Sequence, residues 1–380
     1  MGMDLTKSVN GKLLRCGYTT GACAAAAAKA GASLLLTGNA PERVTLDTPK
    51  GIALVLDVLD PRLEEESARC AIKKDSGDDP DVTDGVLVYA TVSRIPGGVE
   101  IEGGEGVGRV TKPGLDQPVG TAAINSAPRR MIGDAVREVA AAYGYQGGLR
   151  VVISIPEGRA LARKTFNPRM GIEGGISVIG TTGIVEPMSH QALMDTVRLE
   201  FRQLAASGAR DVLLTPGNYG ETFAGETLGL GLTGHIACSN LIGGAIDAAV
   251  ENGFLRILLV GHIGKLVKLG IGAANTHSSE VDGRMETLIA CALEAGAELP
   301  LLRGIAGCVT TDAALILLAQ AGFLGDTMRV FAARAEASLA RRAPGGVTTG
   351  FVCFTNAQGI AGVLAQSGNA GELLEIWRKR

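Results

Sequence analysis

Three glycine-bearing turns follow strand-like runs in the second half of the chain and are the first candidates for a ligand site. They are Gly180-Thr181-Thr182-Gly183, Pro216-Gly217-Asn218-Tyr219-Gly220 and Gly261-His262-Ile263-Gly264. In open α/β sheets, ligands bind beyond the carboxyl ends of the strands, and glycines there let the backbone approach a flat or bulky ligand. The alternative is that these are ordinary turns between strands and helices. Three such turns at one sheet edge favour a small-molecule site.

A second candidate lies near the N-terminus, where Gly17-Tyr18-Thr19-Thr20-Gly21 precedes an alanine-rich segment. The N-terminus of a helix presents unpaired N–H groups that suit a carboxylate or a phosphate, and Arg15 and Lys29 add positive charge nearby. The alternative is that Thr19 or Thr20 only caps the helix. The residue pattern leaves both interpretations open.

Five aspartates stand within ten residues of one polar stretch. They are Asp75, Asp78, Asp79, Asp81 and Asp84. Such a cluster can bind a hard cation, but it lacks the glutamate that closes an EF-hand loop, and Pro80 stiffens it. Hydrogen bonding to an ammonium or pyrrole N–H of a ligand is another alternative. The pattern favours a solvated turn that caps a neighbouring segment.

The chain has four histidines, of which two have informative surroundings. His262 directly follows an apolar run, where general bases often stand. His277 lies in the polar turn Asn275-Thr276-His277-Ser278, ahead of a predicted helix. A single histidine is more often structural than catalytic, so His262 is a candidate general base and no more than that.

Several well-known sequence motifs are incomplete here or lack the structural context that they need. Residues 229–234 match G-x-G-x-x-G but follow no strand, and no acidic residue stands about 20 residues further on in a following strand, so a dinucleotide site is not supported. The stretch 261–265 is too short for a P-loop. The seven cysteines form no CxxC pair, which indicates reduced thiols rather than a zinc knuckle or a disulfide framework.

The composition excludes several classes of protein. The chain has 380 residues, of which 36 are basic and 39 acidic, and it lacks the basic tract that would suit nucleic acid or an anionic membrane. Hydrophobic residues make up 46%, so the chain is not disordered. The N-terminus lacks the apolar stretch of a signal peptide, and Lys29 interrupts the apolar run 21–36. We therefore expect a cytoplasmic protein without a nucleic-acid or membrane partner.

The two halves of the chain differ in how their predicted helices and strands alternate. The first half predicts helices at 22–36 and 128–143 and strands at 43–48, 52–59, 68–73, 86–93, 98–102 and 149–155. The second half predicts strands at 176–180, 211–215, 256–261 and 350–355 and helices at 190–207, 239–252, 281–296, 310–321 and 372–380. We therefore expect an α+β domain with a mostly antiparallel sheet over 1–170. An α/β, Rossmann-like domain with a mostly parallel sheet would follow over 171–380, with the boundary placed to within about 20 residues.

Seven segments in order resemble one known family. They are LRCGYTTGACAAAAAKA (14–30), KDSGDDPDVT (74–83), GVGRVTKPGLDQPVGTAAIN (106–125), KTFNPRMGIEGGISVIGTTGIVEPMS (164–189), PGNYG (216–220), CSNLIG (238–243) and GHIGKLVKL (261–269) with NTHS (275–278). Together they are similar to the cobalt-precorrin-5B C1-methyltransferase family of anaerobic cobalamin biosynthesis. The resemblance runs from about residue 13 to about residue 365. Leu241 departs from it, standing where an aromatic residue is expected.

The resemblance implies a reaction and its partners. S-adenosylmethionine would donate a methyl group to C1 of a cobalt-bearing, ring-contracted tetrapyrrole, giving cobalt-precorrin-6A. The cobalt would be held by the macrocycle, so no dedicated protein metal site is expected. Two other classes stay open: a nicotinamide-dependent oxidoreductase and a non-catalytic tetrapyrrole carrier. The oligomeric state is also open, with a homo-oligomer among the alternatives.

The resemblance also implies site residues. The donor would lie on the three turns of the second half, held by Gly180, Thr181, Thr182, Gly183, Gly217, Asn218, Gly261 and Gly264. The macrocycle, between the domains, would be bound through its carboxylate arms by Arg15, Tyr18, Thr19, Thr20, Arg169, Lys265 and His277. His262 and Glu186 are the expected catalytic proton acceptors.

Overall fold

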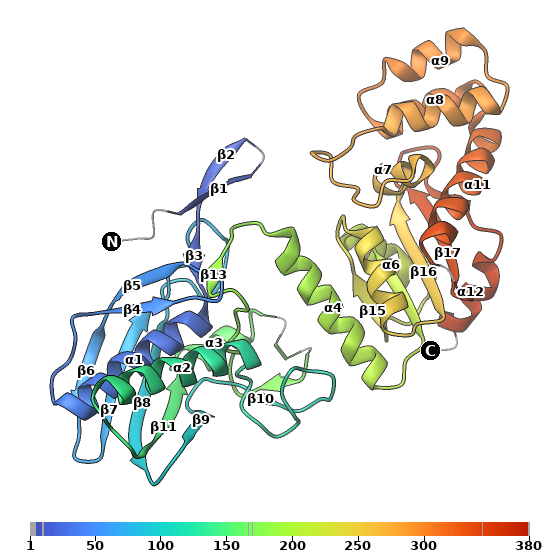
Figure 1. Ribbon diagram of the computed structural model, residues 1–380. Coiled ribbons are helices and arrows are strands. Elements are labelled where there is room, and N and C mark those ends of the chain that lie inside the picture. The colour runs from blue at the N-terminus through green and yellow to red at the C-terminus, as the bar shows by residue number, and fades with distance from the viewer. Residues whose placement is uncertain (1–4, 10, 166, 169, 344, 379–380) are drawn as a thin grey trace. The chain divides into compact units, whose positions relative to one another are not determined.

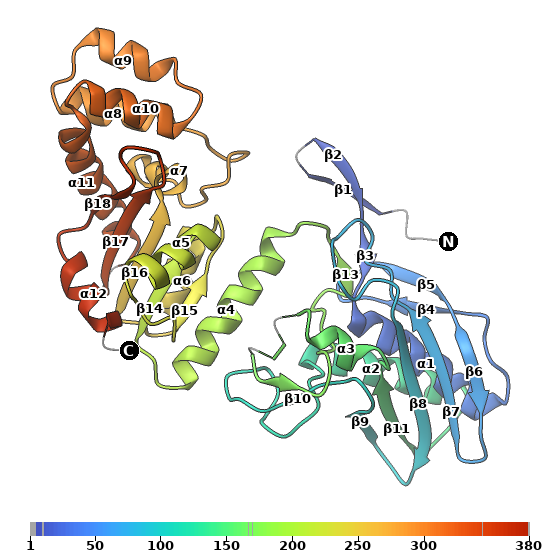
Figure 2. The ribbon, with the colours of Figure 1, turned by 180° about the vertical axis from the view of Figure 1, so that it is seen from behind.

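The protein is described by a computed structural model, which covers residues 5–378 except 10, 166, 169 and 344 (Figure 1 and Figure 2). The chain divides into two compact units, residues 1–190 and residues 191–380. Each unit has its own hydrophobic core and sheet. Within the described residues, no helix is both long enough and apolar enough to cross a bilayer.

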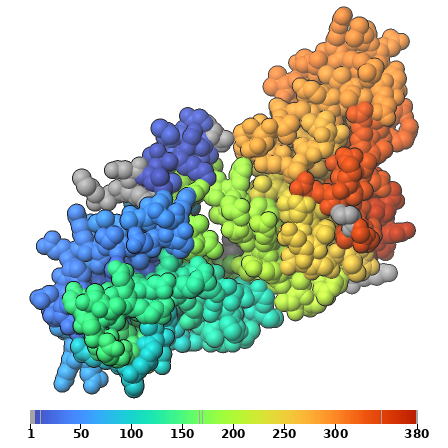
Figure 3. Space-filling model, viewed as in Figure 1, coloured from blue at the N-terminus to red at the C-terminus, as the bar shows by residue number. Residues whose placement is uncertain are grey.

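The first unit is built on a five-stranded sheet. In spatial order its strands are β6 (Leu59–Leu63), β7 (Ser67–Lys73), β8 (Leu87–Ile95), β11 (Gly148–Ser154) and β9 (Val99–Gly103). All neighbours are antiparallel except β11 and β9, so the expected mostly antiparallel sheet is confirmed. Four two-stranded ladders add to it: β1 (Thr6–Val9) with β2 (Lys12–Arg15), β3 (Gly17–Tyr18) with β13 (Ile184–Val185), β4 (Arg43–Asp47) with β5 (Ala53–Asp57), and β10 (Arg109–Val110) with β12 (Ile172–Glu173). The β1–β2 hairpin stands out from the body of the unit (Figure 3).

Two long helices pack against this sheet, α1 (Thr20–Thr37) and α2 (Ser126–Ala142), and a short helix α3 (Gly158–Ala162) follows β11. The alanine run of α1 is fully buried, and its small side chains let the helix approach α2 and strands β7 and β8 closely. The Thr19 side chain accepts the Ala22 N–H at 3.1 Å and begins the helix. Gly38, in the left-handed region at φ 76°, ends it.

The second unit is an α/β structure. Its strands in spatial order are β15 (His235–Ala237), β14 (Asp211–Thr215), β16 (Arg256–His262), β17 (Thr348–Thr355) and β18 (Gly362–Gln366). The first four are parallel and β18 is antiparallel, which confirms the expected mostly parallel sheet.

Helices cover both faces of this sheet (Figure 1 and Figure 2). One face packs on α4 (His190–Ala206), α6 (Ile242–Glu251), η2 (Val267–Ile271), α8 (Arg284–Glu294), α9 (Leu299–Ala306), α10 (Thr311–Gln320) and α11 (Leu324–Arg342). The other packs on the π-helix η1 (Phe223–Thr227) and α12 (Ala370–Arg378). Two short helices, α5 (Asn218–Thr222) and α7 (Ile263–Leu266), begin where β14 and β16 end. Burial of both faces explains why these strands are continuous apolar runs.

Residues 171–190 fold in the first unit, whereas the sequence analysis places them at the start of the second domain. The reason is strand pairing: β12 pairs with β10, and β13 pairs with β3. The expected strand at 176–180 is absent from the parallel sheet. Ile176 and Val178 instead form isolated bridges to residues 107 and 124 of the first unit.

Candidate functional site

Two of the three candidate turns meet at one edge of the parallel sheet. Strands β14 and β16 are parallel neighbours, so the turns that follow them, 216–220 and 261–264, lie side by side. A Cβ atom on Gly261 would stand 2.8 Å from the Pro216 side chain, and one on Gly220 would stand 2.6 Å from the Val260 carbonyl oxygen. Glycine at both positions therefore serves the close packing of the two turns.

The third turn, 180–183, belongs to the first unit and does not follow a strand of the parallel sheet, as the sequence analysis expected it to. Its backbone accepts the Thr19 N–H at the Gly183 carbonyl and the Lys50 N–H at the Thr182 carbonyl. A Cβ atom on Gly180 would collide with the Thr19 side chain. The turn is thus packed against the start of α1 in the first unit.

The His262 ring is held in one orientation by its neighbours. His262 ends β16 and caps α7, and its Nδ1 atom accepts the Gly264 N–H at 3.1 Å. The ring stands edge-on to Phe354, with 5.5 Å between ring centroids. Burial lowers the pKa of His262, although the Asp312 carboxylate acts in the opposite direction. A neutral ring whose Nδ1 accepts a hydrogen bond carries its hydrogen on Nε2.

This tautomer changes what His262 can do. A general base needs an open lone pair, but the lone pair of Nδ1 is used by Gly264, and Nε2 presents an N–H. His262 is therefore placed as a hydrogen-bond donor rather than as the proton acceptor that the sequence suggests. The Gly264 N–H is likewise engaged and is not open to a ligand.

Lys265 brings a positive charge to the same edge. Burial lowers the pKa of Lys265, and the nearby ammonium of Lys268 lowers it further. Its Nζ atom lies 3.3 Å from the position that a Cβ atom on Gly217 would occupy, and Gly217 itself has φ 123°. In the part of the chain that the structure describes, no carboxylate pairs with Lys265.

Tyr219 is a residue of this edge that sequence reasoning did not single out. Its ring is 73% exposed, and its centroid lies 6.4 Å from that of His262. An exposed tyrosine inside a glycine-bearing turn, in a chain with only 4% aromatic residues, is the signal that could have found it.

The loop that contains His277 is fixed from inside by Lys268. Lys268 is only 2% exposed, and its Nζ donates to the carbonyl oxygens of Thr276 at 2.9 Å and Val281 at 2.8 Å. The His277 Nδ1 atom lies 2.6 Å from the Ser279 hydroxyl oxygen. Lys268 is thus a structural cation of the loop, and Thr276, next to His277, donates its N–H to the carbonyl of Asn240, which follows β15.

In the first unit, Arg15 and Tyr18 line a hollow of about 490 Å³ together with Lys73 and the apolar residues Leu56 and Leu59. The Arg15 guanidinium donates to Asp75 at 2.5 Å, and this hydrogen bond lowers the pKa of Asp75. The Tyr18 hydroxyl donates to the Lys73 carbonyl at 2.9 Å.

Thr19 and Thr20 act within the protein. Thr19 caps α1, and the Thr20 hydroxyl both donates to the Ile179 carbonyl and accepts the Ile179 N–H. The capping interpretation of this motif is therefore confirmed for Thr19. Arg169, the remaining predicted substrate residue of this half, lies outside the described residues.

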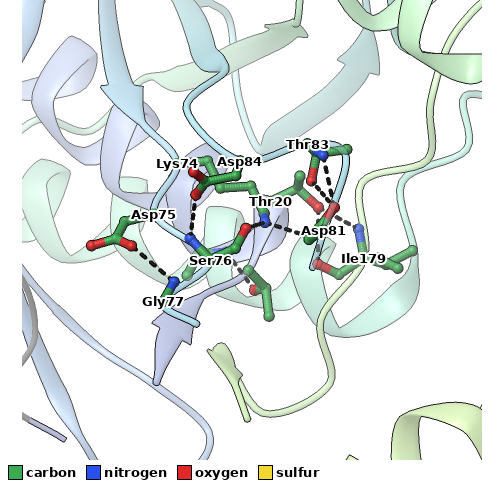
Figure 4. A network of polar contacts seen from close by, with 11 residues as sticks. Thr20, Lys74, Asp75, Ser76, Gly77, Asp81, Thr83, Asp84 and Ile179 are labelled. Carbon is green, nitrogen blue, oxygen red and sulfur yellow. Dashed lines mark hydrogen bonds and ion pairs between the residues drawn. The ribbon is translucent and has the colours of Figure 1, made fainter. Parts of the chain in front are cut away.

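The aspartates of residues 74–84, here called the acidic loop, form hydrogen bonds within the protein (Figure 4). Asp75 accepts the Gly77 N–H, Asp84 accepts the Ser76 N–H, and Asp81 accepts the Lys74 ammonium at 2.6 Å. Asp78 also accepts the Arg15 N–H and Asp79 accepts the Met188 N–H, so the turn caps neighbouring segments, as the preferred interpretation expects. Among the described residues, no group of three or more metal-binding side chains is arranged to hold an ion.

Glu186 is tied to two lysines. Its two carboxylate oxygens form ion pairs with Lys7 of β1 and with Lys50. The hydrogen bonds from Lys50 and Lys7 lower the pKa of Glu186. A carboxylate stabilised in its charged form is a weak base. The structure therefore gives Glu186 a structural role, in place of the catalytic one expected from the sequence.

Comparison with known proteins places the chain in a family. The CbiD family matches residues 7–187, and the CbiD C-terminal domain matches residues 275–364. A protein of Ruminiclostridium cellulolyticum is 49% identical over 321 residues, which cover 84% of this chain and 83% of that protein. The chain belongs to the CbiD family. A relative from Alkaliphilus metalliredigens is 44% identical over 97% of this chain and 96% of its own length. Both relatives are named cobalt-precorrin-5B C(1)-methyltransferase.

One solved structure is also similar to this CbiD-family chain. It is the 1.9 Å crystal structure of the cobalamin biosynthesis protein (cbiD) from Archaeoglobus fulgidus, which is 26% identical. The alignment covers 74% of this chain and 88% of that one, with a TM-score of 0.40.

The acidic loop yields a stability prediction. Gly77 and Gly85 both have positive φ, so alanine costs about 1–2 kcal/mol of backbone strain at either site. A Cβ atom on Gly77 would also stand 2.2 Å from the Arg15 carbonyl oxygen, whereas at Gly85 the nearest atom is 3.8 Å away. We expect Gly77→Ala to lower the free energy of unfolding by about 2 kcal/mol more than Gly85→Ala in urea titrations. Equal losses would contradict the packing described.

The lowered pKa of His262 yields a prediction of how stability depends on pH. Because burial lowers the folded-state pKa of His262, the unfolded chain binds a proton first as the pH falls below about 6.5. The free energy of unfolding therefore decreases from that pH down to the folded-state pKa. His262→Asn keeps an acceptor for the Gly264 N–H but cannot titrate, so its stability should fall less between about pH 7 and pH 5. Proton NMR titration checks the pKa directly, and a value at or above about 6.5 would contradict the account.

Glu186 yields a third prediction. We expect Glu186→Gln to cost about 1 kcal/mol or less of stability and to leave kcat for methyl transfer within about threefold. Glu138→Gln is the matched control, because Glu138 also pairs with a lysine, Lys29, at 2.8 Å. A fall in kcat of about 100-fold in Glu186→Gln alone would restore Glu186 as a catalytic base.

Proposed function

We propose that this chain methylates carbon C1 of cobalt-precorrin-5B, with S-adenosylmethionine as the methyl donor, to give cobalt-precorrin-6A. The observation that carries the proposal is the 44% identity over 97% of the chain to a relative that bears this activity in its name. That alignment includes both units and 96% of the relative's own length.

The edge formed by β14 and β16 fits the donor. At Gly217, φ is 123° and a side chain would crowd Lys265, so the backbone there is open for the close approach of a ligand. Asn218 follows Gly217, while Gly261 and Gly264 support the edge through packing and the His262 cap. Of the cofactor residues expected from sequence, we retain Gly217 and Asn218 as ligand contacts. Gly261 and Gly264 are retained as residues that support this edge. Residues 180–183 are no longer assigned to the donor.

The chemistry requires placement rather than a reactive side chain. A sulfonium donor supplies an electrophilic methyl group, and the new bond to carbon forms as the carbon–sulfur bond breaks. The protein must hold both partners at reacting distance and in line. The second unit contributes an ammonium at Lys265 and an N–H at His262 Nε2, both suited to orienting a ligand rather than attacking it.

We assign the acceptor to the first unit, at the hollow beside Arg15 and Tyr18. Lys73 supplies positive charge for a carboxylate arm, and Leu56 and Leu59 supply apolar surface for the macrocycle, while Arg15 is already paired with Asp75. Thr19, Thr20 and the turn 180–183 hold the segment that carries Arg15 and Tyr18. A reducing, cytoplasmic location is part of the proposal, supported by seven free thiols.

The donor assignment is tested by binding. We expect S-adenosylhomocysteine to raise the melting temperature of the wild-type chain, and NADP to leave it unchanged. Gly217→Ala should weaken S-adenosylhomocysteine about tenfold in isothermal titration, because the added methyl group crowds Lys265.

Gly253→Ala is the matched control for this substitution, because Gly253 also has positive φ but its Cβ atom would meet nothing within 4 Å. Stabilisation by NADP alone would favour an oxidoreductase. Stabilisation by neither ligand would favour a tetrapyrrole carrier. Unchanged affinity in Gly217→Ala would remove the 216–220 turn from the donor site.

A further inference from the structure

We propose that Lys265 and His262 together form a binding site for one carboxylate group, at the edge where β14 and β16 end. The inference rests on the proposed function and names the ligand group that this edge recognises. His262 ends β16 and Lys265 lies in the helix α7 that follows, and both face the 216–220 turn: the Lys265 ammonium at Gly217 and the His262 ring at Tyr219.

The Lys265 ammonium forms no ion pair with any described residue of its unit. A partly desolvated ammonium is costly unless an anion compensates it. The buried thiol of Cys238 lies near enough to act on Lys265, but burial raises the pKa of that thiol to about 12, so it stays neutral. Lys268 adds a like charge. Among the described ion pairs none includes Lys265, and a ligand anion would supply the missing partner.

The second donor of the site is the Nε2–H group of His262. The Gly264 N–H fixes the tautomer at Nδ1, and Phe354 fixes the plane of the ring, so the N–H direction is set before a ligand binds. A cation and a neutral donor together suit a group with a single negative charge and two acceptor oxygens. This is the chemistry of a carboxylate.

Two ligands of the proposed reaction carry carboxylates. One is the amino-acid carboxylate of the methyl donor, and the other is a side-chain carboxylate of the tetrapyrrole. 5′-Methylthioadenosine separates them, because it keeps the adenosine of the donor and lacks the amino-acid part.

The test begins with Lys265→Met, which keeps most of the aliphatic stem and removes the charge. If the site holds the donor, S-adenosylhomocysteine should bind about 10–100-fold more weakly while 5′-methylthioadenosine stays within about twofold. If it holds the acceptor, S-adenosylhomocysteine affinity should be unchanged and the KM of the tetrapyrrole should rise at least about tenfold, with kcat within about threefold. Lys265→Arg, which keeps the charge, should largely restore whichever constant has changed. No change in either constant would overturn the proposal.

The role of His262 is tested by two substitutions that introduce an amide side chain. The longer glutamine of His262→Gln can place an amide N–H near the position that Nε2 occupies. The asparagine of His262→Asn can accept the Gly264 N–H but is too short to reach the Nε2 position. We expect His262→Gln to retain ligand affinity within about threefold and His262→Asn to lose about tenfold. The acid side of the kcat profile should then be the same in wild type and in His262→Gln.

A different pattern would overturn the role of His262. If both amide variants lower kcat by about 100-fold, and both lose an acid limb that the wild-type pH profile shows, His262 is a base. Wild-type protein that neither binds S-adenosylhomocysteine nor transfers a methyl group would instead defeat the proposed function. The two failures are therefore distinguishable.

Discussion

The candidate donor site depends on how closely the turn after β14 can approach the end of β16. Gly220 lies against the Val260 carbonyl oxygen and Gly261 against Pro216, at distances that leave no space for a Cβ atom. This contact brings Gly217 to the same sheet edge as His262 and Lys265, which lie more than 40 residues further along the chain. Larger residues at either glycine would separate the turns, and the groups that we assign to ligand binding would no longer face each other.

The charged groups at the two candidate sites differ in whether they have partners within the protein. In the first unit, the charges around the α1 motif are paired inside the protein: Arg15 with Asp75, Lys74 with Asp81, and Glu186 with two lysines. Such pairs fix loops and consume the charges that a ligand would need. In the second unit, neither the ammonium of Lys265 nor the Nε2–H of His262 has an acceptor among the residues that the structure describes. Unpaired but positioned donors are the features expected where a ligand supplies the acceptor.

Much of the fold could be predicted from the sequence because local pattern and final packing agree. The alanine-rich α1 with its Thr19 cap and the apolar strands β14, β16 and β17 all lie where residue pattern places them. The long helix α11 was not predicted, although Met328, Phe331, Ala335 and Leu339 follow helical spacing, because its many charged residues and alanines weaken the apolar signal.

The site was predicted less completely, since its errors come from contacts distant in sequence. Residues 176–180 read as a buried strand followed by a turn, and only their pairing with the first unit shows that Gly180 packs on Thr19. The lysine partners of Glu186 come from residues 7 and 50, and the tautomer of His262 follows from a backbone N–H. Neither spacing nor residue type reveals such contacts. The position of His262 and Lys265 beyond β16 was predictable, because strand ends follow from apolar runs.

The central claim is that the methyl donor binds the second unit at the end of β14 and β16. Amide hydrogen exchange of the full chain, measured with and without S-adenosylhomocysteine, tests it directly, because a bound ligand slows exchange in the segments that it contacts or stabilises. The account predicts slowed exchange in residues 216–220 and 261–266. Slowed exchange confined to the first unit, with these two segments unaffected at saturating ligand, would contradict it.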